Sequence, residues 1–172
     1  MIRTLGALVG AAPRAEDLAC SLERRLEQAR ARAALLQRRP RVYFEEWDEP
    51  MISGIRWVAE LIETAGGLDV FPTLSCCKSA KDRIVSPQQV IGAAPDIIVG
   101  SWCGKKFVPA KVAARPGFAS IPAVRDGFLR EIKSPLILQP GPAALTDGLD
   151  ALADIIEEWA TRAISKDRAR PS

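Results

Sequence analysis

The chain has 172 residues, a formal net charge of +3 at pH 7, 48% hydrophobic residues and 26% charged residues. These values are ordinary for one soluble globular domain and give no reason to expect a nucleic-acid partner. The chain contains no histidine, which excludes Ser-His and Cys-His catalysis within it and any metal site that needs imidazole. Its cysteines show no C-x-x-C spacing and therefore do not predict a zinc site.

The amino-terminal part is expected to form two helices. Residues 2–9 are apolar and predicted to be helical up to Gly10, and their short, glycine-interrupted apolar core does not make a convincing signal peptide. A long helix is predicted over residues 14–38, about 37 Å in length at about 1.5 Å per residue. That length is unusual on a small domain and indicates a strut. Its apolar stripe is formed by Leu18, Leu22, Leu26, Ala29, Ala33 and Leu36.

A strand, an exposed tip and a helix are predicted over residues 41–67. Residues 42–44, Val-Tyr-Phe, indicate a buried strand, and Trp47 follows where this strand leaves the core. Pro50 is expected to block the strand, and Ser53 to cap the helix that follows. The apolar positions of that helix, which ends at a glycine pair, are Ile55, Val58, Ala59 and Ile62.

Strands and helices alternate through the rest of the chain. Further strands are predicted at residues 70–71, 96–100 and 128–132, and further helices at residues 86–95 and 143–164. Ser86 and Gln89 have the spacing of a helix capping box. Residues 165–172 are expected to be a disordered tail. This alternation predicts an α/β fold, a three-layer lobe with a mostly parallel sheet, preceded by a long strut helix.

Two tryptophans are candidate ligand contacts. Trp47 and Trp102 each follow a predicted parallel strand, and the carboxyl ends of such strands form the ligand-binding edge of open α/β sheets. We therefore expect both indoles on one edge, where flat aromatic faces suit a large, partly apolar ligand. Trp57 and Trp159 lie within predicted helices and are expected in the core.

No motif assembles into a catalytic site. Residues 100–106, GSWCGKK, are one residue too short for a phosphate-binding loop and lack its Ser or Thr. The WCGK stretch within them is similar to a thioredoxin site, but lysine replaces the second cysteine. Glu45 and Glu46 are neighbours on a strand, so they point to opposite faces and cannot act as an acid/base pair. The chain is therefore not expected to be an enzyme.

Three long segments carry a resemblance to a known family. They are VYFEEWDEPMISGIRWVAELIETAGG, AKDRIVSPQQVIGAAPDIIVGSWCGKK and IPAVRDGFLREIKSPLILQPGPAALTDGLDAL. With them, residues 41–155 resemble the carboxyl-terminal lobe of substrate-binding proteins for metal chelates, in the cobalamin-binding branch of the iron-siderophore/cobalamin family. Members have two α/β lobes joined by one long rigid helix, hold the ligand between the lobes and deliver it to an ABC permease. The resemblance implies four parts: a first-lobe remnant (1–12), the connecting helix (13–39), the carboxyl-terminal lobe (40–164) and a tail (165–172).

The resemblance also implies a ligand, cobalamin or a related corrinoid, with no further cofactor and no metal site. Haem or a ferric siderophore is the nearby variant. Without histidine, the chain cannot replace the lower axial base of cobalamin by imidazole. Gln88 stands where the family often has a glutamate that docks into the permease, and its lack of charge departs from that pattern. The implied ligand-binding residues are Trp47, Asp48, Trp102, Cys103, Lys133, Ser134 and Gln139.

The resemblance leaves out most of the first lobe, so half of the family's ligand cleft is expected to be missing. The alternative function is an interaction module or split-gene lobe that pairs with a separate first lobe, or with itself through the 14–38 helix. For that reason we expect the leucines of the strut to be less buried than the apolar residues of the 54–65 helix. The two sets compared are Leu18, Leu22 and Leu26 against Ile55, Val58 and Ile62. Family resemblance implies the periplasm, and the cytoplasm is the alternative.

Overall fold

The sheet lies at the centre of the computed structural model, which describes residues 1–168. Its strands are β1 (Arg41–Asp48), β2 (Met51–Ser53), β3 (Leu68–Asp69), β4 (Ile97–Gly100) and β5 (Leu129–Glu131). The strand order is β2-β1-β4-β5, with β3 also paired to β1. Only β2 is antiparallel to its neighbour among these pairs. The expected mostly parallel sheet is therefore confirmed.

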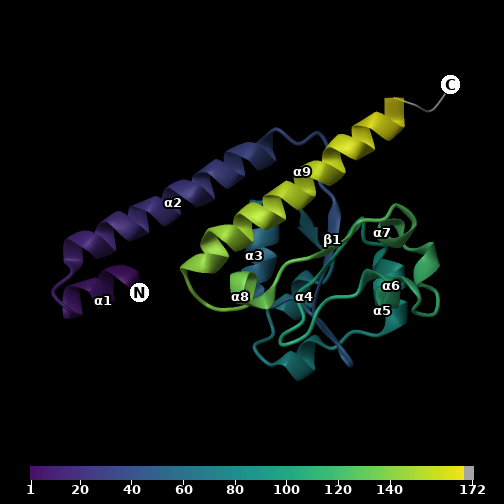
Figure 1. The fold of residues 1–172 in the computed structure, drawn as a ribbon, viewed down its shortest axis with the longest axis horizontal. Helices are drawn as coiled ribbons and strands as arrows, with labels where there is room; N and C mark the ends of the chain where they lie inside the picture. Colours follow the sequence, from purple (N-terminus) through teal and green to yellow (C-terminus); the bar gives the residue numbers. More distant parts are fainter. Residues whose placement is uncertain (169–172) are drawn as a thin grey trace.

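Helices cover both faces of the sheet and make three layers (Figure 1). One face carries α3 (Arg56–Thr64) and α9 (Asp147–Arg168), against which α2 (Ala12–Ala34) packs. The other face carries α5 (Pro87–Ala93), α6 (Pro109–Ala113) and α7 (Pro122–Arg125). The remaining elements are α1 (Ile2–Leu8), α4 (Pro72–Ser75), α8 (Ser134–Ile137), η1 (Ala80–Arg83), η2 (Phe118–Ser120) and η3 (Pro142–Leu145).

The alternation of side chains along β1 and β4 divides the core between these two faces. Val42 and Phe44 pack toward α3 and α9, while Tyr43 between them packs toward α5 and α6. Ile97 and Ile98 of β4 divide in the same way. Successive side chains of a strand point to opposite faces, and both faces are covered, so these strands are continuous apolar runs.

The α1–α2 hairpin stands at the amino-terminal side of the lobe. Here α1 folds back on α2, and Gly6 lies so close to Ala15 that a Cβ on Gly6 would be 2.1 Å from the Ala15 Cβ. Leu18 of α2 is 41% exposed and Leu26 is half-buried, as expected for a strut. For Leu22 the expectation fails against Ile55, because Leu22 faces α1 and the lobe and is only 4% exposed, whereas Ile55 is partly buried. Val58 and Ile62 are fully buried, as expected.

Ser53 does not cap a helix, and this corrects the sequence prediction. Strand β1 continues to Asp48, turns at Pro50 and pairs with β2, which contains Ser53. The Ser53 hydroxyl donates a hydrogen bond to the Arg83 carbonyl (3.1 Å). The amino end of α3 is instead held by the Glu46 carboxylate, which accepts the Ile55 N–H (2.8 Å).

Several boundaries also differ from the predicted ones. The short strand after α3 is β3 at Leu68–Asp69, two residues earlier than expected. The long helix α2 ends at Ala34 instead of residue 38. The last helix continues to Arg168, so residues 165–168 are helical, and the rest of the expected tail lies outside the described residues. None of the helices within residues 1–168 combines the length and the apolarity needed to cross a membrane.

The predicted capping box of α5 is confirmed. The Ser86 hydroxyl accepts the Gln89 N–H (3.2 Å), and the Gln89 side chain accepts the Ser86 N–H (2.7 Å). This reciprocal pair satisfies two backbone donors at the helix start. Gln88 lies on the same first turn and is exposed to solvent.

Candidate ligand-binding edge of the sheet

The ends of three parallel strands lie level with one another. In the register of the sheet, Glu45 of β1 is opposite Gly100 of β4, which is opposite Glu131 of β5. The ladder continues one step further, since Ser101 N–H donates to the Glu45 carbonyl (2.9 Å) and Ile132 N–H to the Gly100 carbonyl (3.1 Å). The segments that follow β1, β4 and β5 therefore meet at one edge of the sheet.

Trp102 is held inside this edge. The side chain is only 5% exposed, and its indole N–H donates to the Glu45 carboxylate (3.0 Å). Its ring meets the Phe107 ring edge-on at 5.0 Å, and Phe107 lies so close to Gly100 that a Cβ there would be 1.9 Å from it. Trp102 thus does not offer the open aromatic face that its position in the sequence suggested. Only a small part of its surface is accessible at this edge.

The Glu45 carboxylate is fully buried and has four donors. Arg115 gives it two hydrogen bonds (2.6 and 3.0 Å), and Tyr43 and Trp102 give one each. Tyr43 is also fully buried, as expected, and burial raises the pKa of its hydroxyl well above the ordinary value, with a further increase from the Glu45 charge. Since a buried carboxylate needs a compensating cation, Arg115 stabilises the whole cluster.

A second buried ion pair fixes the β1–β2 hairpin. Glu46 lies 2.8 Å from the guanidinium of Arg83, which is 3% exposed and also donates to the Ser53 carbonyl. Burial raises the pKa of Glu46 in spite of Arg83 and the Ile55 N–H, which both lower it. Glu45 and Glu46 thus make separate contacts on opposite sides of β1, as predicted.

Lys105 connects the two tryptophans. Its ammonium group lies 4.2 Å from the ring centroid of Trp47 and 5.3 Å from that of Trp102, and it forms an ion pair with Asp48. Trp47 is half-buried, and its indole N–H donates to the Glu49 carbonyl (2.9 Å). The expectation that both indoles lie on one edge is therefore confirmed, and a cation lies over them.

A depression of about 490 Å³ opens at this edge. Its lining is Trp102, Gly104, Lys105, Lys106, Glu131, Lys133, Ser134 and Pro135. Of the residues proposed from the sequence, Trp102, Lys133 and Ser134 lie in this lining. Trp47 and Asp48 adjoin it through Lys105.

Two other residues proposed from the sequence lie outside the lining of this depression. Cys103 is exposed in the loop after β4, and Gln139 is exposed beyond α8. All the cysteines of the described chain are free thiols. Residues 1–168 contain no group of three or more His, Cys, Asp or Glu side chains that could hold a metal ion.

Sequence reasoning did not assign a site role to Lys105, Lys106 or Glu131. The two lysines were considered only within motifs that the sequence does not complete, a phosphate-binding loop and, for Lys105, a thioredoxin-like stretch. They lie in the same loop after β4 as Trp102. Glu131 ends β5, and its carboxylate accepts the Phe107 N–H (3.1 Å), which ties the loop after β4 to β5. The position of these residues after two parallel strands was the available signal.

The comparisons with known proteins identify the family. A family model described as "Periplasmic binding protein" matches residues 1–136. This chain belongs to that family. No curated protein matches it.

Solved structures show the same fold, and their names are those of binding proteins. The periplasmic heme-binding protein RhuT from Roseiflexus sp. RS-1 in apo form has a TM-score of 0.71 and 25% identity, covering 90% of this chain and 61% of that one. A Staphylococcus epidermidis ATCC 12228 protein, described as a possible iron-binding (periplasmic solute-binding) protein, has a TM-score of 0.77 and 20% identity, covering 90% and 59%. S. aureus IsdE complexed with heme has a TM-score of 0.72 and 18% identity, covering 90% and 62%.

The chain spans about three fifths of the length of these three proteins. The family and these structures are those of substrate-binding proteins of transport systems, so the expectation that the chain is not an enzyme is confirmed. The resemblance to metal-chelate binding proteins is confirmed at the level of the family.

Proposed function

We propose that this chain supplies one wall of the ligand site of a substrate-binding protein that carries a metal chelate to an ABC-type importer. The observation that supports this most is the arrangement of Trp47, Trp102 and Lys105 at the level ends of parallel strands. The half-buried ring of Trp47 and the neighbouring polar depression, whose lining includes the mostly buried Trp102, suit a large ligand that is apolar on its faces and polar at its periphery.

The chelate that the sequence resemblance favours is cobalamin or a related corrinoid. Haem and iron chelates are the other members of the class, because RhuT and IsdE are named as binding heme and the S. epidermidis protein as a possible iron-binding protein. In this proposal the contact residues are Trp47, Asp48, Trp102, Cys103, Lys133, Ser134 and Gln139. Trp102, Lys133 and Ser134 have the strongest support, since they line the same depression.

Partners and compartment follow from the same proposal. The protein acts in the periplasm and docks on a permease through the exposed first turn of α5, with Gln88 in place of a charged residue. A first lobe, carried by another polypeptide or by more of the same one, closes the ligand from the opposite side. Without that lobe, binding is weak, because much of the contact area is lost while the entropy cost of immobilising the ligand remains.

A second candidate function is an interaction module, and the surface of the α1–α2 hairpin favours it. Leu5, Leu8 and Val9 of this hairpin are 52%, 78% and 74% exposed, and Leu18 is 41% exposed. Several exposed apolar side chains on one helical hairpin suit a surface that another protein covers. This module pairs with a separate first lobe or with a second copy of the chain.

The proposed function is tested by calorimetric titration of the 172-residue chain with cyanocobalamin, haemin and a ferric hydroxamate. Weak binding of at least one chelate is expected, and Trp47→Ala should reduce its affinity by a factor of about 30, or about 2 kcal/mol, as for other aromatic anchors. Ile84→Ala, which truncates an exposed apolar side chain outside the depression, is the matched control and should bind like the wild type. Binding that is unchanged by Trp47→Ala would refute this site, and no binding of any chelate would favour the interaction module.

A further inference from the structure

The depression at the sheet edge has an excess of unpaired positive charge. Lys106 and Lys133 lie in its lining, both are exposed, and neither takes part in an ion pair within the described part of the chain. Lys105 is already paired with Asp48. The one acidic side chain in the lining is Glu131, which accepts a backbone N–H from Phe107.

The surroundings of these two lysines make them suited to an anionic group. A concave site with low-dielectric walls concentrates the potential of the charges that line it. Here Trp102 and Pro135 provide apolar wall, and Ser134, a residue that is 7% exposed, adds a hydroxyl to the lining. A lysine ammonium is a compact charge with three donors, so it binds carboxylate or phosphate oxygens without requiring one fixed geometry.

We propose that Lys106 and Lys133 form an anion subsite that binds carboxylate or phosphate groups at the periphery of the chelate. This inference rests on the proposed function, and it narrows the ligand class to chelates with anionic substituents. Lys105 has a different role, because Asp48 already neutralises it and its position over Trp47 and Trp102 aligns these side chains. The apolar body of the chelate lies toward the tryptophans, and its anionic edge lies toward Lys106 and Lys133.

A pair of chelates that share one macrocycle, and of which only one has free carboxylates, tests the subsite. Haemin carries two free carboxylates, which haemin dimethyl ester lacks. We expect the 172-residue chain to bind haemin about tenfold more tightly than the ester at low salt, and this ratio to shrink as salt screens the charges. The double variant Lys106→Gln/Lys133→Gln should bind both compounds equally.

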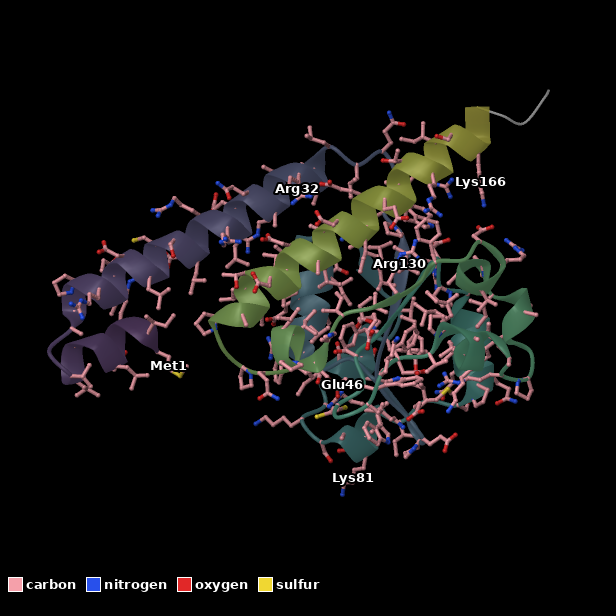
Figure 2. The ribbon with its side chains drawn as sticks, in the orientation of Figure 1. Met1, Arg32, Glu46, Lys81, Arg130 and Lys166 are labelled. Carbon is pink, nitrogen blue, oxygen red and sulfur yellow. The ribbon has the colours of Figure 1, made fainter. Side chains whose placement is uncertain are left out.

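Lys166→Gln is the control for a general change of charge. Lys166 lies near the carboxyl end of α9 (Figure 2), where it pairs with Asp126, and it is not part of the lining of the depression. This variant should keep the wild-type preference for haemin. A preference that is lost equally in Lys166→Gln would overturn the proposal, because the effect would then reflect net charge.

The outcomes separate the subsite from the proposed function. If haemin and its ester bind with equal affinity, the anion subsite is wrong and the chelate site stands. If neither binds, the proposed function fails, and citrate, a chelate-free tricarboxylate, decides the subsite by amide NMR. Shifts of the amides of residues 104–106 and 133–134 that disappear in the double variant then support the subsite, and unchanged spectra overturn it.

Discussion

The carboxyl-terminal edge of the sheet and the α1–α2 hairpin differ in how deeply their ion pairs are buried and in how much apolar surface they expose. At the sheet edge two ion pairs lie beneath the surface: Glu45 is fully buried with Arg115, and Arg83 is 3% exposed with Glu46. At the hairpin the charges are outside, in ion pairs such as Arg25–Asp150, whose side chains are 43% and 52% exposed. Apolar side chains remain exposed on the same hairpin.

The difference indicates what each region is built to do. A buried ion pair contributes little net stability, but it fixes the segments that carry its two partners, and removing one partner is costly. The loops that hold Trp47 and Trp102 are fixed in this way. On the hairpin, exposed ion pairs between α2 and α9 leave the apolar surface available to a partner. Figure 2 shows Arg32 of α2 beside α9, where it pairs with Glu157 and Asp154.

The strongest test of this comparison removes one cation from each region. Arg115→Met leaves the Glu45 carboxylate buried without its ion-pair partner, and should lower the free energy of unfolding by about 3–5 kcal/mol. Arg25→Met removes an exposed pair and should cost less than about 1 kcal/mol. Urea denaturation of both variants measures the two values.

A matched double variant isolates the cause. If the cost of Arg115→Met arises from an uncompensated charge, adding Glu45→Gln should recover part of the lost stability. A double variant that is less stable than Arg115→Met would show that Arg115 acts through packing. Equal costs for Arg115→Met and Arg25→Met would remove the proposed distinction between the two regions.

The next test compares two leucines of one helix. Leu22 is 4% exposed between α1 and the lobe, while Leu18, one turn earlier, is 41% exposed. Leu22→Ala should cost about 2 kcal/mol, at the low end for buried leucines because hollows already adjoin its side chain. Leu18→Ala should change stability by less than about 0.5 kcal/mol.

Self-association should respond to the same two substitutions in the opposite order, with the larger effect for Leu18→Ala. If the exposed surface of the hairpin takes part in self-association, Leu18→Ala should weaken it, as measured by sedimentation velocity over a range of concentrations. Leu22→Ala should affect association only through unfolding. A wild-type chain that remains monomeric at all concentrations would exclude the homodimer and leave a separate lobe as the partner.

The sequence predicted the strands and helices whose signals are local. Residues 42–44 and 97–99 are continuous apolar runs, and the capping box at Ser86 lies within four residues. The level ends of β1, β4 and β5 followed from the expected parallel pairing, so the position of this edge, where the candidate site lies, was predictable.

The errors occurred where a distant side chain decides the outcome. Trp102 is buried because Glu45, 57 residues earlier, accepts its indole N–H. The Ser53 hydroxyl could accept hydrogen bonds at a helix start, but Ser53 lies in β2, which pairs with β1. Its hydroxyl donates to the Arg83 carbonyl instead. Leu22 is covered by a helix whose packing depends on Gly6. None of these partners can be read from a short window of sequence.

Acidification should change the contributions of Glu46 at the sheet edge and of the Arg32–Glu157 pair between α2 and α9 to the free energy of unfolding in opposite directions. Burial raises the folded-state pKa of Glu46 above its unfolded value, so its protonation favours the folded state, and this contribution is lost as pH rises through the folded pKa. Arg32 lowers the pKa of Glu157, so that pair stabilises the fold above the unfolded pKa of Glu157 and loses this effect as pH falls through the folded pKa.

These opposite signs predict a small pH dependence, measured as the free energy of unfolding between pH 7 and pH 4. The difference between wild type and Arg32→Gln should be below about 1 kcal/mol at pH 7, because the pair is partly exposed, and it should shrink on acidification. The wild type should gain stability relative to Glu46→Gln over the same range, because only the wild type takes up a proton at this position. If both differences change in the same direction with pH, the charges of the sheet edge and the hairpin are not held in opposite ways. A control variant, Arg56→Gln, breaks an exposed pair within α3 and corrects both curves for general charge effects.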